Sequence, residues 1–283
     1  MIIIAESGST KTNWLTESKE LFETIGFNPL FFSSDDIHQE LMKQEDLFIQ
    51  REQFTQVFFY GASCSSDDRK KTVYDALKKY FPKAELISVD HDMNAAAVAT
   101  YNGRPGIACI LGTGSNSCLY DGIEIYEEVP ALGYLLGDEG SGAYFGKKLL
   151  ARFLYHELPE ATMKMLKEDY GLEKEKIFDA VYKKPHVNVY LATFAKVLTD
   201  SPDKDYMEKF AEEGFEDFFS HHVCCYENYK QYPVHFVGSI AFHFKDRLQK
   251  VADKFGSELG IVDKNPVYRL LDWHLNNLKP ANQ

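Results

Sequence analysis

Short apolar runs alternate with amphipathic stretches over the first 111 residues of the chain. The apolar runs cover residues 2–5, 57–60, 86–89 and 106–111. They are rich in β-branched and aromatic residues and end close to a glycine or a polar turn, which predicts buried strands. Residues 35–47, 67–80 and 91–101 instead have apolar positions at helical spacing. This alternation predicts an α/β fold, with a mixed sheet covered by helices.

The first strand breaks at Ser7-Gly8-Ser9, and residues 12–15 are again apolar enough to form a strand. A strand, a turn and a returning strand predict a β-hairpin.

The second half of the chain has a different pattern. A polar, hairpin-like stretch over 117–129 precedes a mostly helical region over 140–229, and a strand over 234–237 ends at Gly238-Ser239. We therefore predict two domains, 1–116 and 117–283. Each has an apolar strand that ends in a glycine-containing turn, which suggests an internal duplication.

The chain has 283 residues, of which 45% are hydrophobic and 26% are charged, and this is the composition of a globular protein. The formal net charge of −12 argues against nucleic acid as a partner. An anionic nucleotide would need local features to hold it, such as backbone amides, helix N-termini or a metal ion.

The five cysteines show no CxxC spacing, and their odd number favours buried thiols in a reducing compartment over a disulfide framework or a zinc site. The N-terminal apolar run is too short for a signal peptide, and no stretch approaches the length of a membrane span. We expect a soluble, cytoplasmic protein without a membrane partner.

Four glycine turns follow apolar strands and carry hydroxyl side chains. They cover residues 6–12, 61–63, 112–116 and 238–241. Glycine lets backbone N–H groups approach a phosphate closely, so such turns can cradle phosphates. A single turn of this kind is explained equally well by the need of the chain to reverse direction. None fits the Walker or dinucleotide-binding patterns, so those folds are disfavoured.

Seven spaced motifs carry a family resemblance over nearly the whole chain. They are AESGSTKTNW from residue 5, GFNP from 26, YGAS from 60, HD at 91–92, ILGTGSNS from 110, GYLLGDEGSG from 133 and VGSIAFHF from 237. The chain resembles the N-acetylglucosamine kinase branch of the BadF/BadG/BcrA/BcrD ATPase family, in the actin/hexokinase/Hsp70 superfamily. That resemblance implies two ribonuclease-H-like, actin-like ATPase lobes with a central cleft.

The resemblance also implies functional roles at matching positions. The implied nucleotide-binding residues are Ser9, Thr10, Lys11, Gly112, Thr113, Gly114, Ser115, Gly238 and Ser239, and the implied sugar-binding residues are Asn28, Asp92, Gly133 and Asp138. Asp92 would also be the catalytic base, and Glu6 would hold Mg²⁺ through water.

The residues themselves leave alternatives open. Asp92 follows a predicted strand at a helix start, where it can serve as a base or simply cap the helix. Asp138-Glu139 can complement a helix dipole, although three nearby glycines favour a ligand site. Asn28 before Pro29 is either a ligand-facing amide or an ordinary turn residue.

Four positions depart from the family pattern. Glu6 stands where the first glycine turn of the family, a phosphate loop, usually begins with Asp. Asn13 stands where many relatives have Asp, and Ser63 stands where glycine is usual. Arg269 stands where relatives have a glycine beside the adenine.

The leading hypothesis is a kinase that transfers the γ-phosphoryl of ATP to the 6-hydroxyl of N-acetylglucosamine or a close amino sugar, using Mg²⁺. Its partners would be the small-molecule sugar and ATP, with a homodimer as the candidate assembly. Two alternatives come from other classes. One is an ATPase activator of a dehydratase, which needs a cluster bridged by cysteines such as Cys118. The other is a catalytically degenerate sugar- or nucleotide-binding sensor, which would have no use for a base at Asp92.

Overall fold

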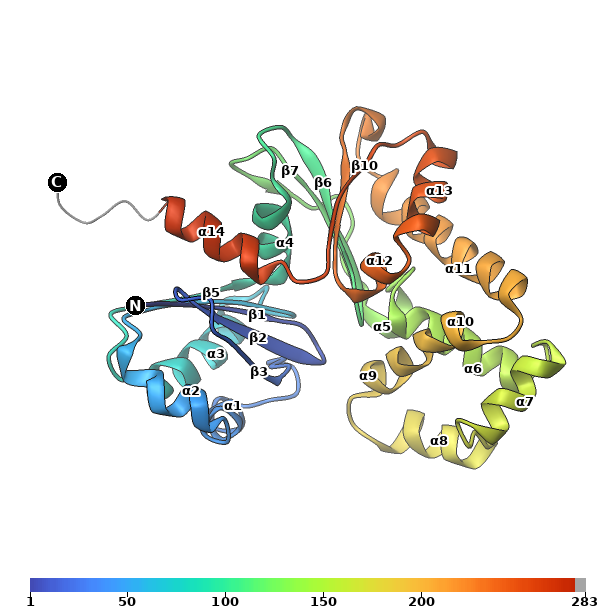
Figure 1. The fold of residues 1–283 in the computed structure, drawn as a ribbon, viewed down its shortest axis with the longest axis horizontal. Helices are drawn as coiled ribbons and strands as arrows, with labels where there is room; N and C mark the ends of the chain where they lie inside the picture. Colours follow the sequence, from blue (N-terminus) through green and yellow to red (C-terminus); the bar gives the residue numbers. More distant parts are fainter. Residues whose placement is uncertain (278–283) are drawn as a thin grey trace. The chain divides into compact units, whose positions relative to one another are not determined.

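The structure is a computed structural model that describes residues 1–277, and it divides into two compact units (Figure 1). Unit 1 comprises Met1–Arg104 together with the segment from Asn265, and unit 2 comprises Pro105–Lys264. The predicted boundary after residue 116 differs from this division. Residues 106–111 pair with residues 115–120 along their whole length, so both strands belong to unit 2.

Unit 1 is built on a five-stranded mixed sheet. Its strands are β1 (Ile2–Ser7), β2 (Lys11–Thr16), β3 (Leu21–Ile25), β4 (Gln56–Gly61) and β5 (Leu86–His91). Its helices are α1 (Ser34–Met42), α2 (Glu45–Gln50), α3 (Asp67–Tyr80), α4 (Asp92–Thr100) and α14 (Val267–Asn277), with a 3₁₀ turn at Arg51–Gln53.

Unit 2 is built on a second five-stranded sheet and is richer in helix. Its strands are β6 (Gly106–Leu111), β7 (Ser115–Tyr120), β8 (Ile125–Tyr126), β9 (Val234–Val237) and β10 (Leu259–Asp263). Its helices are α5 (Gly133–Leu136), α6 (Gly142–Leu154), α7 (Glu160–Glu168), α8 (Lys174–Lys183), α9 (Val187–Ala192), α10 (Val197–Asp200), α11 (Lys204–Phe218), α12 (Ser239–His243) and α13 (Lys245–Phe255), with 3₁₀ turns at Thr193–Lys196 and Tyr229–Gln231 and a π-helix at Phe219–Val223.

The two sheets have the same topology. Their strand orders are β3-β2-β1-β4-β5 and β10-β9-β6-β7-β8, which correspond when the second is read from β8 to β10. In each, the first strand pairs antiparallel with the second and parallel with the fourth, and the outer pairs have matching senses. The expected duplication is therefore present in the sheet topology, and the predicted α/β fold class is confirmed.

Neighbouring residues of β1 enter different cores of unit 1, because side chains alternate across a strand. Ile3 and Ala5 join the cluster that contains Trp14 and residues of α1 and α3. Ile4 joins a smaller cluster in which Val267, Leu270 and Leu271 of α14 pack with residues of α4. The helix α14 thus completes unit 1 although it follows unit 2 in the sequence.

A single large apolar cluster forms the core of unit 2. It includes Phe145 of α6, Phe210 and Phe215 of α11, and Phe236 of β9. The aromatic residues of α11 and of the π-helix Phe219–Val223 therefore contribute to this core.

Three elements differ from the sequence prediction. The helix predicted over 35–47 is broken at Lys43-Gln44, where Gln44 has an extended backbone with φ −89° and ψ 90°. The break lets both Leu41 and Leu47 reach the same core. The edge strands β3 and β10 were not predicted, and they are partly exposed along much of their length.

Candidate functional site

The first predicted phosphate loop is the tight turn between β1 and β2. The Gly8 N–H donates to the Lys11 carbonyl over 3.0 Å, and the Gly26 N–H donates to the Thr10 carbonyl over 3.1 Å. A Cβ at Gly26 would lie 2.2 Å from the Gly8 carbonyl oxygen, so the turn rests directly on the backbone of Gly26. Ser9 is half-buried and Thr10 is exposed.

Two hydroxyls fasten this turn to the chain that follows β3. Ser7 Oγ and Thr12 Oγ1 are 2.7 Å apart, Thr12 donates to the Ile25 carbonyl, and Ser7 accepts from the Phe27 N–H. The next residue, Asn28, is 6% exposed, and its Oδ1 accepts from the Leu30 N–H over 2.9 Å. The structure therefore brings Asn28 to the first loop and uses its side-chain oxygen in a turn.

Lys11, another predicted nucleotide ligand, forms an ion pair with Glu23 of β3, with 2.6 Å between Nζ and Oε2. Both side chains are about half exposed, so this pair contributes little stability and leaves the lysine able to move.

Glu6 lies on β1 directly opposite Asn13 of β2. The Asn13 Nδ2 is 3.5 Å from Glu6 Oε2, so the amide orients the Glu6 carboxylate. An aspartate at position 13 would repel that carboxylate instead. Within residues 1–277, no cluster of three or more His, Cys, Asp or Glu side chains could hold a metal ion. A single carboxylate suits Mg²⁺ that keeps most of its waters and is held mainly by nucleotide phosphates.

Asp92 is the first residue of α4 and follows β5, which runs parallel to β4 and β1. Glu6 and Asp92 therefore both lie toward the carboxyl ends of parallel strands in the sheet of unit 1, the edge where α/β proteins bind ligands. The Asp92 side chain is 21% exposed, and its Oδ1 is 3.1 Å from His91 Nε2. Burial raises the pKa of Asp92 above its ordinary value, although His91 opposes this shift.

Asp90, two residues before Asp92, is an ion-pair partner instead. Its Oδ1 accepts from Lys70 Nζ over 2.7 Å and from the His91 N–H over 2.9 Å. Burial alone would raise the pKa of Asp90, but these hydrogen bonds hold it below its usual value. Neighbouring aspartates thus have pKa shifts in opposite directions.

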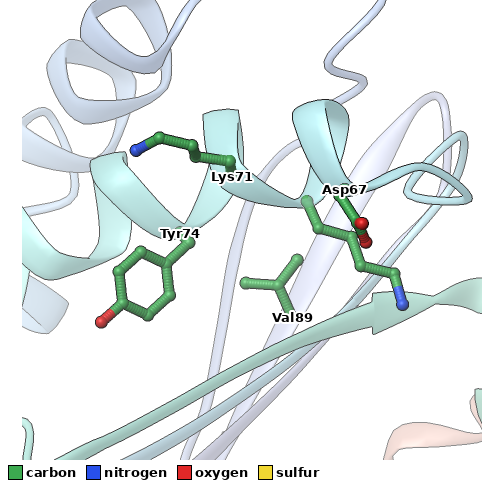
Figure 2. Close-up of a pocket in the computed structure, with 5 residues that line it drawn as sticks. Asp67, Lys71, Tyr74 and Val89 are labelled. Atoms are coloured by element: carbon green, nitrogen blue, oxygen red, sulfur yellow. The ribbon is translucent and has the colours of Figure 1, made fainter.

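A surface pocket of about 370 Å³ lies between α3 and the edge strand β5 (Figure 2). Figure 2 shows Asp67, Lys71 and Tyr74 on the helix and Val89 on the strand below. None of the residues predicted to bind sugar or nucleotide lines this pocket.

The second predicted phosphate loop is the turn between β6 and β7. The Gly112 N–H donates to the Gly114 carbonyl over 3.0 Å. The first N–H groups of α6 hold the loop from behind, since Gly142 donates to the Gly112 carbonyl and Ala143 to the Thr113 carbonyl.

Asp138 packs against this second loop. Its Oδ1 accepts from the Ser115 N–H over 3.3 Å, and a Cβ at Gly114 would lie 2.9 Å from its Oδ2. Asp138 has φ +60°, an unusual backbone conformation for a residue with a side chain. The Ser115 Oγ is buried and has no hydrogen-bond partner among the described residues.

Gly238 also packs against the second loop. It has φ +114°, and a Cβ there would lie 2.4 Å from the Leu111 carbonyl oxygen. Unit 2 therefore gathers Gly112–Ser115, Asp138 and Gly238-Ser239 at the carboxyl ends of β6 and β9. Gly133 lies on α5 with φ +71°, and a Cβ there would meet no described atom within 4 Å.

Two further side chains at this group of residues carry no signal in the sequence. Lys147 Nζ donates to the Tyr134 carbonyl over 2.7 Å and so ties α5 to α6. His222 Nε2 lies 3.3 Å from Glu139 Oε2. No motif marks either residue, and His222 lies in an aromatic-rich helical stretch, a pattern that is typical of core.

Two of the departures from the family pattern have defined places. Ser63 has φ +64°, in the left-handed region that favours glycine, which is the residue usual there. Arg269 is an exposed residue in the first turn of α14, in unit 1.

Comparisons with known proteins place the chain among sugar kinases. It matches no family profile and no curated protein. It is 38% identical to a candidate N-acetylglucosamine kinase of known structure from Porphyromonas gingivalis, with 98% of this chain and 99% of that chain covered and a TM-score of 0.89.

More distant structures share the fold. A candidate N-acetylglucosamine kinase from Chromobacterium violaceum is 16% identical, with a TM-score of 0.65 and coverage of 96% of this chain and 98% of that chain. A ROK family glucokinase from Streptomyces griseus, solved with glucose and AMPPNP, is 13% identical, with a TM-score of 0.54 and coverage of 95% and 97%.

None of the helices described over residues 1–277 is long and apolar enough to cross a membrane.

The match to the Porphyromonas gingivalis protein spans nearly all of both chains and agrees with the seven motifs. The chain therefore belongs to the sugar kinases with the actin-like ATPase fold that form the N-acetylglucosamine kinase branch of the BadF/BadG/BcrA/BcrD family.

Proposed function

We propose that the protein transfers the γ-phosphoryl group of ATP to the 6-hydroxyl of N-acetylglucosamine or a close amino sugar. The buried, unpartnered Ser115 hydroxyl carries the nucleotide half of this proposal. A buried hydroxyl without a partner costs about 1–3 kcal/mol, so it needs a compensating contact. A phosphate oxygen at the second glycine turn would supply that contact. The choice of sugar follows the Porphyromonas gingivalis relative.

Asp92 is the proposed general base. Its carboxylate accepts the proton of the sugar hydroxyl as that oxygen attacks the γ-phosphorus, and the bond from the γ-phosphorus to the bridging oxygen of ADP breaks. A raised pKa favours this role, because proton transfer is most efficient when the pKa of the base is near the working pH. In the same scheme Asn28, Gly133 and Asp138 bind the sugar.

The two glycine turns are the proposed nucleotide contacts. Ser9, Thr10 and Lys11 belong to the turn in unit 1, and Gly238 and Ser239 would lie against the adenosine in unit 2. Glu6 is the proposed second-sphere ligand of Mg²⁺, which would neutralise phosphate charge when bound.

The test is a coupled ADP-release assay over a panel of sugars, with wild type and Asp92→Asn. N-acetylglucosamine should give the highest kcat/KM, and Asp92→Asn should lower kcat by about 10²–10⁴-fold while the sugar still binds, because the amide cannot accept the proton. Calorimetric titration with sugar provides the binding control. A variant that kept a third of wild-type turnover would remove Asp92 from the base role.

The dehydratase-activator alternative depends on an accessible Cys118. In the structure Cys118 is fully buried within β7, which disfavours a cluster held there. The sensor alternative predicts sugar binding without ADP release, so the same assay distinguishes it.

A further inference from the structure

His222 is a buried histidine that lies behind the second phosphate loop. It belongs to the π-helix Phe219–Val223, in which the Cys224 N–H donates to the Phe219 carbonyl over 2.9 Å. A single π turn within a helix is uncommon and often accompanies a functional site. The wider turn gives His222 a position that an unbroken continuation of α11 would not give it.

Two contacts connect His222 to both segments of the proposed site in unit 2. Its backbone carbonyl accepts from the Ser117 hydroxyl over 2.7 Å, two residues after the loop ends on β7. Its Nε2 lies 3.3 Å from Glu139 Oε2, next to Asp138. Its ring also stacks on Phe218, with 4.9 Å between centroids and 18° between planes.

The geometry identifies the tautomer of this histidine. The residue is 4% exposed, and its Nδ1 is buried without a hydrogen-bond partner among the described residues. A proton on Nδ1 would be an unsatisfied buried donor, so the ring is neutral and Nε2–H donates to Glu139. The contact is thus a directional hydrogen bond from a neutral ring.

The turn that carries Glu139 has little freedom elsewhere. A Cβ at Gly140 would lie 3.1 Å from Phe218 Cβ, so the π-helix end of α11 supports this turn directly. Asp138 is held in its left-handed conformation by the same turn, and its carboxylate accepts from the Ser115 N–H. A shift of Glu139 would therefore also shift the neighbouring Asp138 carboxylate.

We infer that His222 is a positioning residue for the sugar-binding turn: its Nε2–H fixes Glu139, which sets the place of the Asp138 carboxylate at the second phosphate loop. This inference rests on the proposed function, since it gives His222 a role in that same site. A misplacement of about 1 Å in such a site can cost on the order of 10²-fold in rate.

The test compares His222→Phe, His222→Gln and wild type by steady-state kinetics with N-acetylglucosamine and ATP. His222→Phe keeps the stacked aromatic ring in the core and removes the donor, so the variant should remain folded. We expect its kcat/KM for the sugar to fall by about tenfold or more, with the KM for ATP within about threefold of wild type. His222→Gln, which again carries an N–H donor, should recover most of the loss.

His221 provides a matched control. It is the preceding residue of the same π-helix, it is exposed, and its Nδ1 contacts the Asp217 carbonyl instead of Glu139. His221→Gln should stay within about twofold of wild type, as surface substitutions usually do.

A double-mutant cycle with Glu139→Met tests the contact itself, also in case His222→Phe folds poorly. If the two residues act together, the double variant should lose no more activity than the worse single variant. Losses that multiply, or a His222→Phe enzyme with wild-type kcat/KM, would overturn the inference. Failure of the proposed function is a separate result, because wild type itself would then release no ADP with the sugar.

Discussion

Two buried serines lie two residues apart on β7 and differ in their hydrogen bonds. Ser117 Oγ donates to the His222 carbonyl and lies 3.1 Å from the Tyr226 hydroxyl. Ser115 Oγ has no partner among the described residues. The same residue type in the same strand is therefore fully hydrogen-bonded at one position and unsatisfied at the other.

This difference predicts opposite outcomes for the two alanine substitutions. Ser117→Ala should lower the free energy of unfolding by about 1–3 kcal/mol, because it leaves buried polar groups unpaired. Ser115→Ala should leave stability unchanged or slightly higher, and should raise the KM for ATP about tenfold through loss of a hydrogen bond to a charged phosphate. Chemical denaturation and steady-state kinetics of both variants measure these effects. A Ser115→Ala enzyme with wild-type KM for ATP would contradict the phosphate contact.

At the residue scale, motifs predicted the glycine turns from the sequence, but they did not predict the residues that pack against those turns. Gly112 and Gly114 are recognisable because glycine next to hydroxyl residues after a strand is a local pattern. The contact between His222 and Glu139 joins residues 83 positions apart and depends on one π turn. A single sequence carries no local signal for such a contact.

In unit 2, α6 passes very close to α9 at Gly146. A Cβ at Gly146 would lie 1.9 Å from the Leu191 carbonyl oxygen, which is backbone and cannot rotate away. Gly142, one turn earlier on α6, is less crowded, since its Cβ would lie 3.1 Å from the Ala192 Cβ.

Gly146→Ala should therefore force α6 and α9 apart and lower the free energy of unfolding by about 1–3 kcal/mol or more. Gly142→Ala should cost clearly less, because a contact of 3.1 Å requires a shift of only a few tenths of an ångström. Urea unfolding of both variants compares them. Equal stability of the Gly146 variant and wild type would show that the two helices separate without cost.

At the element scale, strong boundary signals made some predictions accurate. The helix over 67–80 and the strands over 106–111 and 234–237 have the predicted ends. The helix begins at acidic residues and ends before Pro82, and each of the two strands is followed directly by a glycine. The strands β3 and β10 were missed because their partly exposed residues do not form a continuous apolar run.

At the scale of the whole molecule, His274 ties α14 to the sheet of unit 1. Its Nε2 is 2.9 Å from the Tyr60 hydroxyl, and its ring lies 3.9 Å from that of Phe58. Burial lowers the pKa of His274 to about 4. The folded protein therefore holds this imidazole neutral.

Acid should consequently weaken the folded state through His274. The unfolded chain takes up a proton near pH 6.5, while the folded chain does so only near pH 4, so stability falls as the pH drops through this window. The full loss is about 3 kcal/mol from this one group. His274→Phe should flatten the pH dependence of the melting temperature between pH 6.5 and 4. An unchanged slope in that variant would assign the acid sensitivity to other groups.

The split of unit 1 could not be predicted from the sequence. Nothing in residues 267–277 distinguishes a helix that packs on residues 4, 15 and 58 from one that continues unit 2. Apolar positions such as Val267 and Leu271 predict a buried face, but the partner of that face is set by the topology.

Because unit 1 is interrupted by unit 2 in the sequence, the cores of the two units can be completed at different times during translation. All of Pro105–Lys264 emerges before α14 does, so unit 2 can complete its core while the nascent chain of unit 1 still exposes Ile4, Leu15 and Phe58. Those side chains are covered only when Val267, Leu270 and Leu271 arrive. During translation, the apolar cluster of unit 1 around Ile4 is thus completed after the core of unit 2.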